Sequence, residues 1–148
     1  MIALIQRVTE ASVRVDGSTI AAIGHGLLAL IAVVRSDDRA RADRLLQRLL
    51  DFRLYPDASG RMALSLREQG GGLLLVPQFT LAADTGRGNR PSFSPAAPPE
   101  QANLLFDHLL TQARAAHGNT ASGQFGAHMQ LALVNDGPVT FWLQSPEP

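Results

Sequence analysis

Alternation of apolar and polar residues marks the first part of the chain as rich in strands. Residues Ile2–Val8 alternate in the manner of a half-buried strand. The short segments Val13–Val15 and Thr19–Ile23 flank Asp16-Gly17, a pair that favours the tight turn of a β-hairpin. The run Leu27–Val34 is apolar on both faces, which is typical of a central strand that is covered on each side. The pattern therefore predicts a sheet that starts at the first residues.

Two later segments repeat their apolar residues with the period of an α-helix. Ser36-Asp37-Asp38 offers N-cap side chains for a helix that runs to Asp51, and Pro98-Pro99-Glu100 starts a second helix that ends near Ala116. The polar face of the first helix carries arginines, which we interpret as a solvated face rather than an RNA contact. The side chains expected on the buried faces are Ala42, Leu45, Leu46 and Leu49 in the first helix, and Ala102, Leu105, Phe106, Leu109 and Ala113 in the second.

The segments between and after the helices supply short strands and one long loop. Leu54-Tyr55 and Leu73–Val76 are predicted strands, and we interpret Gly70–Gly72 as a flexible connector. Residues 85–99 are rich in Gly, Pro, Ser and Arg, which predicts a long exposed loop of the kind that often carries function. No internal repeat or linker is found. Residues 1–148 are therefore expected to form a single α/β domain, with largely antiparallel β-sheets packed in layers with two main helices.

The last part of the chain contains an abrupt break in an apolar pattern. Met129–Val134 predicts a strand, the pattern stops at Asn135-Asp136-Gly137-Pro138, and Val139–Leu143 resumes as a second strand. Gly137 can adopt backbone angles that other residues reach only at a cost, and Pro138 fixes its own φ. One interpretation is a hairpin turn that only reverses the chain. The other is a rigid backbone probe at the rim of a site, which needs a second motif to support it.

The second motif is Pro77-Gln78-Phe79-Thr80-Leu81, directly after the predicted strand Leu73–Val76. A strand that stops at a proline and exposes Gln78, Phe79 and Thr80 presents backbone N–H groups and one hydroxyl at a sheet edge. Such N–H groups can stabilise an oxyanion. The alternative is a capped strand end with Phe79 in the core. Thr80 has no apparent base beside it in the sequence, which argues against a strong nucleophile.

Composition removes several other kinds of chemistry. The chain has no cysteine, and all thirteen basic residues are arginine, so thiolate, Schiff-base and lysine-dependent P-loop sites are excluded. None of the four histidines is paired at metal-ligand spacing or in a recognisable triad, so neither a metal nor a cofactor is expected. Formal net charge is zero, so any RNA contact must be local. The longest apolar run is too short to span a bilayer and no signal peptide is apparent, so we expect a cytoplasmic protein.

Together these stretches resemble the D-aminoacyl-tRNA deacylase family, also called D-tyrosyl-tRNA deacylases. The resemblance covers essentially the whole chain. It is carried by Met1–Val8, Gln78–Leu81, Arg90–Phe93 and Leu133–Leu143, which follow one another in the order of the family's motifs. It implies hydrolysis of the ester that links a D-amino acid to the 3′ end of tRNA. Glycine mischarged on a non-cognate tRNA is a further implied substrate, and aminoacyl-tRNA is the implied partner.

The resemblance also implies a homodimer with two sites built across the subunit interface. In that arrangement Asn135–Thr140 of one subunit enters the pocket formed by Gln78–Leu81 of the other. The Gly137-Pro138 bond is expected to be cis, with two carbonyl oxygens directed at the substrate α-carbon, and Val139 belongs to the same selectivity segment. A D-side chain or a hydrogen is then tolerated, whereas an L-side chain meets rigid backbone.

Further site residues follow from the same resemblance. The catalytic group is Gln78–Thr80, and the role of Thr80 stays open between nucleophile and positioning group. Arg7 matches a position thought to hold the Gly-Pro turn, and an ordinary strand-edge arginine is the alternative. Arg87 and Arg90 in the exposed loop are candidates for phosphate contacts, with solvated loop arginines as the alternative.

One position departs from the family pattern, because the family usually has Ser where this chain has Pro77. A related eukaryotic branch, which acts on L-alanine mischarged to threonine tRNA, also has proline there but usually has alanine at the position of Phe79. Pro77 marks either relaxed chirality or a neutral local change, and we favour the neutral change because the Gly137-Pro138 turn is retained. The rival functional class is a non-catalytic RNA-binding or dimeric interaction module on the same fold.

Overall fold

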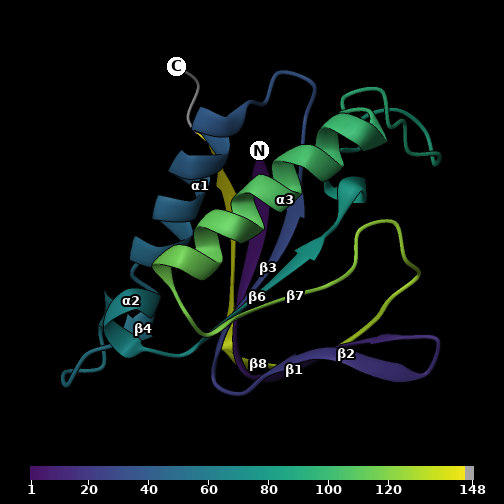
Figure 1. The fold of residues 1–148 in the computed structure, drawn as a ribbon. Coiled ribbons are helices and arrows are strands. Elements are labelled where there is room, and N and C mark those ends of the chain that lie inside the picture. Colours follow the sequence, from purple (N-terminus) through teal and green to yellow (C-terminus); the bar gives the residue numbers. More distant parts are fainter. Residues whose placement is uncertain (146–148) are drawn as a thin grey trace.

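The computed structural model describes residues 1–145, which form one six-stranded mixed sheet with two main helices on one of its faces (Figure 1). Neighbouring strands pair in the order β2-β1-β3-β6-β7, and β8 pairs with β1 as well. The strands of this sheet are β1 (Ile2–Val15), β2 (Ser18–Ile23), β3 (Gly26–Ala32), β6 (Gly72–Pro77), β7 (Thr120–Ser122) and β8 (Gln130–Gln144). The other elements are α1 (Arg39–Asp51), β4 (Tyr55–Pro56), β5 (Met62–Leu64), α2 (Leu66–Gln69), the 3₁₀ helix η1 (Phe79–Ala82) and α3 (Pro99–Ala116). The predicted α/β class with largely antiparallel pairing and two main helices is confirmed.

The long strand β1 organises the sheet because it pairs along its whole length. Its first half, Ile2–Val8, lies between β3 and the end of β8, and its second half, Ala11–Val15, lies between β2 and the start of β8. All three pairings are antiparallel. The sequence predicts two separate segments here, but the structure has one strand, since Glu10 still pairs with Val134 of β8. The predicted turn at Asp16-Gly17 is confirmed, with φ values of 50° and 78°.

The main core lies between the sheet and the two helices. The buried faces that the sequence predicts for α1 and α3 are confirmed. These faces cover Ile5 of β1, Leu27 of β3 and Leu73 of β6. Asp38 is the N-cap of α1, and its carboxylate accepts a hydrogen bond from the Arg41 N–H at 2.8 Å. The two helices therefore cover one face of the sheet.

The opposite, helix-free face is covered at both ends. At one end Leu28 of β3 and Leu74 and Val76 of β6 are buried in a second core with the later part of β1. At the other end Ile2 and Ala32 pack against Ala82 of η1. Further along this face Leu4 is only half-buried, and its cross-strand neighbour Trp142 is 51% exposed. A large aromatic side chain is thus left open to solvent beside apolar neighbours.

Two features of the parallel arm of the sheet correct the sequence predictions. β3 pairs with β6 and β6 with β7 in parallel. The sequence pattern predicts no strand at β7, because its three residues show no apolar alternation. The prediction that Gly70–Gly72 is a flexible connector is wrong. Gly70 caps α2 with a φ of 79°, and a Cβ on Gly71 would lie 2.6 Å from the His25 carbonyl oxygen. Close approach of two backbone segments, rather than flexibility, requires glycine there.

The strand β8 does not contain the hairpin that one interpretation of the sequence predicts. Both of its halves pair antiparallel with β1, so they run in the same direction. Val8 pairs with Asn135 and Gln6 pairs with Thr140, so residues 136–139 lie opposite the single residue Arg7. The segment is a bulge of four residues opposite one, which carries the backbone out of the ladder and returns it to the same strand. The hairpin interpretation is therefore wrong.

Candidate active site

The Gly-Pro bulge, defined as residues 135–140, is braced from inside by Asn135. The side-chain oxygen of Asn135 accepts from the Val139 N–H at 2.7 Å. Its side-chain nitrogen donates to the Val139 carbonyl at 3.3 Å and to Thr140 Oγ1 at 2.9 Å. Val139 is buried, whereas Gly137 and Pro138 are exposed. The bulge is thus a braced backbone whose tip projects into solvent.

Arg7 holds the bulge from the side of the sheet. Its Nε donates to the Asp136 carbonyl at 3.0 Å and lies 3.5 Å from the Asp136 carboxylate. Its Nη1 donates to the Leu54 carbonyl at 2.7 Å, in the segment that follows α1. The Arg7 side chain is 12% exposed, so these charge-assisted contacts are largely shielded from water. The structure places Arg7 against the bulge and not at a free strand edge.

Gly137 occupies a position that a larger residue does not fit. The Gly137-Pro138 peptide is cis, as the resemblance predicts. The φ of Gly137 is +142°, in the region that favours glycine. A Cβ at this position would lie 2.6 Å from Val139 Cγ2 and 3.0 Å from the Val139 nitrogen. Backbone conformation and steric contact both require glycine here.

The second motif forms η1 at the end of β6. The Gln78 N–H donates to the Ile31 carbonyl at 2.7 Å, which ties the start of η1 to β3. Gln78 Nε2 donates to Thr80 Oγ1 at 2.5 Å, so an amide and not a base positions this hydroxyl. Within residues 1–145 the N–H groups of Phe79 and Thr80 have no acceptor, as is usual for the first turn of a helix. These two N–H groups are available to bind an oxyanion.

The long loop packs against η1 through an aromatic pair. Phe79 is 57% exposed, so the alternative with its ring in the core is wrong. The ring packs instead on Phe93, with ring centroids 5.1 Å apart. Backbone hydrogen bonds of 2.7 and 3.0 Å between Asp84 and Ser92 pin the loop near its base. The exposed residues Arg87 and Arg90 lie between these two anchor points.

The two motifs do not meet within one chain. The bulge lies opposite Arg7, which pairs with Leu27, whereas η1 follows Pro77, which pairs with Ile31. Leu27 and Ile31 are four positions apart on β3. At the rise of an extended strand this corresponds to about 13 Å. The two exposed motifs therefore lie at separate places along the sheet of one chain.

The part of the chain that the structure describes contains neither a cluster of metal ligands nor a helix that could span a membrane. No group of three or more His, Asp or Glu side chains there could hold a metal ion. His108 lies 2.8 Å from the Asp43 carboxylate, and His117 Nε2 lies 2.6 Å from the Gly71 carbonyl oxygen. Among residues 1–145, no helix has the length and apolar character needed to cross a membrane.

Comparison with known proteins decides the family. The family model described as D-Tyr-tRNA(Tyr) deacylase matches residues 4–144. The chain belongs to the D-Tyr-tRNA(Tyr) deacylase family. The family membership and the enzyme class expected from the sequence, an ester hydrolase of the D-aminoacyl-tRNA deacylase type, are confirmed.

Similarity to members of this deacylase family extends over the full length. A D-aminoacyl-tRNA deacylase of Thioalkalivibrio sulfidiphilus is 63% identical, over 100% of this chain and 99% of the relative. That of Methylococcus capsulatus is 60% identical, over 99% of this chain and 95% of the relative. A solved structure described as c-Myc DNA Unwinding Element Binding Protein has a TM-score of 0.94 at 38% identity, and covers 99% of this chain and 100% of its own. A probable eukaryotic D-amino acid tRNA deacylase has a TM-score of 0.87 at 17% identity over 96% of this chain and 97% of its own, which shows the shared fold.

Three groups near the deacylase motifs are not apparent from the sequence. The Leu54 carbonyl anchors Arg7, Phe93 packs on Phe79, and Tyr55 lies beside the Leu54 anchor. The Arg7–Leu54 and Phe79–Phe93 contacts join separate segments of the chain, and a backbone carbonyl leaves no trace in a residue pattern. The loop around Phe93 stands out through its composition and the Arg90–Phe93 motif, but neither indicates the contact with Phe79.

Tyr55 is a buried polar residue next to the Leu54 anchor of Arg7. It is 1% exposed, and its hydroxyl has no hydrogen-bond partner within residues 1–145. Burial raises the pKa of Tyr55 above its ordinary value, the Arg7 charge lowers it, and the Asp136 charge raises it. Its ring packs on His25, with ring centroids 5.5 Å apart. Within residues 1–145 no hydrogen bond compensates for the hydration that this hydroxyl loses on folding.

Replacing Tyr55 with phenylalanine is expected to leave the free energy of unfolding unchanged or to raise it by up to about 1 kcal/mol. The substitution keeps the ring packing and removes only the unpaired hydroxyl. Denaturant unfolding of both proteins, with equal m-values, measures the difference. A loss of more than about 1 kcal/mol would show that the hydroxyl has a stabilising partner after all.

Proposed function

We propose that the chain acts as one D-aminoacyl-tRNA deacylase domain whose active site is completed by a second copy of the chain. The full-length identity of 63% to a curated D-aminoacyl-tRNA deacylase carries the proposed substrate class. The separation of η1 from the Gly-Pro bulge along β3 supports the two-chain site. Aminoacyl-tRNA as the substrate also supports the cytoplasm as the proposed location.

The helix-free face of the sheet is the proposed surface for the second copy. Exposed Trp142 and half-buried Leu4 lie on this face, and the exposed ring of Phe79 lies on η1 at the end of it. Apolar and aromatic side chains of this kind are enriched at the centre of protein interfaces. Contacts across a two-fold axis are reciprocal, so one such axis can bring η1 of each copy to the bulge of the other. A homodimer would then hold two equivalent sites.

The proposed reaction is hydrolysis of the ester between the D-amino acid and the terminal ribose of tRNA. Water adds to the ester carbonyl carbon, the bond to the ribose oxygen breaks, and that oxygen leaves with a proton. The products are the free amino acid and tRNA. The N–H groups of Phe79 and Thr80 are the proposed donors to the negative carbonyl oxygen. The Thr80 hydroxyl has an amide neighbour, Gln78, which supports a positioning role, and a ribose hydroxyl is available to assist the water.

The backbone of Gly137-Pro138 is the proposed chiral filter. Its support is the bracing described above: Asn135 holds the bulge from within, and Arg7 holds it from the sheet. A rigid backbone excludes an L-side chain by contact and admits a D-side chain, whatever its identity. Glycine has only a hydrogen in place of the side chain, so the filter also admits it. Mischarged glycyl-tRNA is therefore a further proposed substrate.

The long loop supplies the proposed tRNA contacts. Arg87 and Arg90 are exposed in this loop, and the loop packs on η1 through Phe93. Guanidinium groups near a catalytic segment can bind phosphates and fix the orientation of the nucleic acid. Such local contacts are compatible with a formal net charge of zero.

A deacylation assay tests the proposed function. We expect the purified protein to release D-tyrosine from D-Tyr-tRNA and to spare L-Tyr-tRNA. The rival function is a binding module without catalysis. The name of the 38% identical solved structure, c-Myc DNA Unwinding Element Binding Protein, supports this alternative. Binding of tRNA without release of D-tyrosine would favour that module and refute the deacylase.

Subunit mixing tests the two-chain site independently. One inactive variant carries Phe79→Pro and the other carries Gly137→Ala, and the two are unfolded, mixed and refolded together. If each site takes η1 from one chain and the bulge from the other, a mixed dimer has one doubly altered site and one unaltered site. Activity should then return to about a quarter of wild type, because half of the dimers are mixed. No recovery, despite mixed dimers seen by mass spectrometry, would place both motifs of a site in one chain.

Replacing Pro77 with serine is expected to be nearly neutral. Pro77 ends β6, where the next ladder donor is the Gln78 N–H, so the missing N–H of Pro77 has little consequence. The free energy of unfolding should change by less than about 1 kcal/mol. The preference for D-Ala-tRNA over L-Ala-tRNA should stay the same in both proteins. If wild type cleaves the L-form readily and Pro77→Ser stops this, Pro77 determines specificity.

Deacylation is expected to continue in the presence of a chelator. The proposed groups are backbone N–H donors and one hydroxyl, and none of them requires a metal ion. The measurement compares rates with and without EDTA on a substrate whose RNA fold is unaffected by the chelator. A loss of activity that a divalent ion restores would contradict this prediction.

A further inference from the structure

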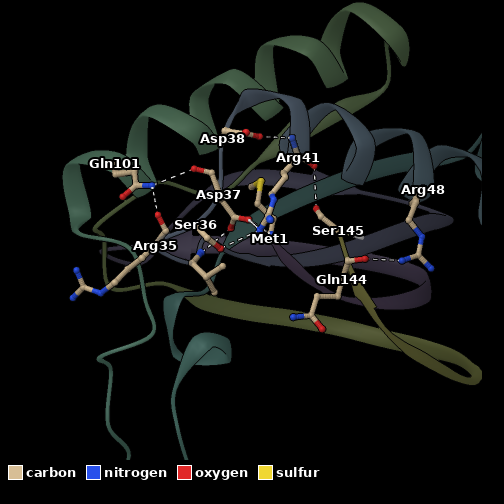
Figure 2. Close-up of polar contacts among 11 residues, drawn as sticks. Met1, Arg35, Ser36, Asp37, Asp38, Arg41, Arg48, Gln101, Gln144 and Ser145 are labelled. Atoms are coloured by element: carbon tan, nitrogen blue, oxygen red, sulfur yellow. Dashed lines mark hydrogen bonds and ion pairs between the residues drawn. The ribbon is translucent and has the colours of Figure 1, made fainter. Parts of the chain in front are cut away.

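The α-ammonium group of Met1 is buried in an ion pair with Asp37 (Figure 2). Both groups are 0% exposed. The other carboxylate oxygen of Asp37 accepts from the Val34 N–H at 2.7 Å, and Arg41 Nη1 lies 3.7 Å from the paired oxygen. A buried carboxylate is costly without a cation, and a buried ammonium group is costly without an acceptor. Asp37 therefore forms a built site for a positive charge at this position.

Hydrogen bonds that involve four elements close around this pair. The Ser145 N–H donates to the Met1 carbonyl at 2.9 Å, and Ser145 Oγ donates to the Arg41 carbonyl at 3.0 Å. Gln101 of α3 donates through Nε2 to the carbonyls of Arg35 and Asp37, at 3.1 and 3.2 Å. The start of β1, the end of β8 and the first turns of α1 and α3 thus meet here (Figure 2). A group larger than an ammonium at Met1 would have to displace these contacts.

The α-amino group of Met1 differs chemically from every side chain of the protein, because no side chain carries a primary amine. All thirteen basic residues are arginine, and the sequence contains no lysine. The group is therefore the one primary amine in the sequence. Reagents that acylate or methylate amines report on this single position.

We propose that Asp37 and its surroundings form a recognition site for the free α-ammonium group of Met1, so that the covalent state of this amine controls the stability of the fold. An acyl cap removes the positive charge, and a preceding residue turns the amine into an amide. Either change places a neutral group against the buried Asp37 carboxylate and leaves Arg41, with Nη1 at 3.7 Å, as its nearby cation. An N-terminal deacylating hydrolase would reverse a cap: water adds to the acyl carbon, the C–N bond breaks, a carboxylic acid leaves, and the amine takes up a proton. Such a maturation step does not depend on the proposed tRNA deacylase activity.

Amine labelling tests the burial of the group. An amine-reactive acylating reagent should modify the folded protein at least about 100-fold more slowly than the unfolded chain, as expected for a group exposed only on opening. Mass spectrometry should then find a single label, on Met1. Labelling of the folded protein at the rate of a short Met-Ile peptide would overturn the proposal.

A comparison of four proteins tests whether the state of the Met1 amine and the charge of Asp37 are coupled in their effect on stability. The four proteins are the free and the N-acetylated chain, each with Asp37 and with Asp37→Asn. Acetylation of the Asp37 protein should lower the midpoint of thermal unfolding by about 10 °C. In the acetylated chain, Asp37→Asn should raise the midpoint, whereas in the free chain it should lower it. If the acetylated Asp37 protein does not fold, the proposal still requires that the acetylated Asp37→Asn protein does.

A matched control uses the exposed carboxylate of Asp43 on α1. The substitution Asp43→Asn should change the midpoint slightly and equally in the free and acetylated chains. Equal midpoints for the free and acetylated Asp37 proteins would overturn the proposal. So would an effect of Asp37→Asn that has the same sign and size in both forms.

Discussion

Replacing Phe79 with proline should reduce kcat/KM for D-Tyr-tRNA by about 10²–10³-fold, the loss that is typical for one oxyanion donor. Phe79 is the first residue of η1, a position that accepts proline because its N–H has no helical acceptor. The preceding Gln78 has φ −144° and ψ 74°, outside the α region that proline disfavours before it. The substitution therefore removes the donor and leaves the local backbone in place. Steady-state deacylation kinetics measure the loss.

The control for this prediction is Phe79→Ala. Alanine removes the same ring and its contact with Phe93, but keeps the N–H group. We expect Phe79→Ala to retain activity well above that of Phe79→Pro, with both proteins folded by circular dichroism. If the two variants lose activity to the same extent, the ring and not the N–H group is responsible, and the oxyanion assignment is wrong.

Replacing Gly137 with alanine should lower D-specific deacylation by about 100-fold or more, since a misplacement of about 1 Å in an active site has effects of that size. The added Cβ would meet Val139 Cγ2 at 2.6 Å, and alanine is strained at a φ of +142°. The bulge must then shift, and its tip moves relative to the substrate. Parallel assays with D-Tyr-tRNA and L-Tyr-tRNA separate a loss of rate from a loss of selectivity.

Gly60→Ala provides the matched control for Gly137. Gly60 also has a positive φ, +84°, but no atom lies within 4 Å of an added Cβ. Its substitution should lower the free energy of unfolding by about 1 kcal/mol and leave kcat/KM unchanged. Wild-type rate and selectivity in Gly137→Ala would refute the chiral filter.

The elements that the sequence predicted well are those whose signal is local. The buried faces of α1 and α3 follow from a period that one segment carries by itself, and the turn at Asp16-Gly17 follows from two adjacent residues. The bulge in β8 was open to two interpretations because its shape depends on pairing with β1, more than a hundred residues away. The same Asn-Asp-Gly-Pro sequence would suit a hairpin if both halves paired with each other.

The two site motifs were visible in the sequence, but their surroundings were not. Gln78–Thr80 and Gly137-Pro138 stand out because proline and glycine interrupt apolar runs. The anchor of Arg7 on the Leu54 carbonyl and the ring contact of Phe79 with Phe93 depend on the tertiary fold. Sequence also could not show that one chain keeps the two motifs apart, since this follows from the register of β1, β3 and β6.

The Gly-Pro bulge also affects how this protein resists aggregation. Within residues 1–145, β8 pairs only with β1, so its outer side is a strand edge. A long regular edge is a template on which foreign strands can add. The bulge divides this edge into the shorter runs 130–135 and 140–144, and Pro138 offers no N–H to an incoming strand. An intruding chain would lose its register at the bulge, so a deletion that straightened β8 would expose an uninterrupted surface for fibril growth.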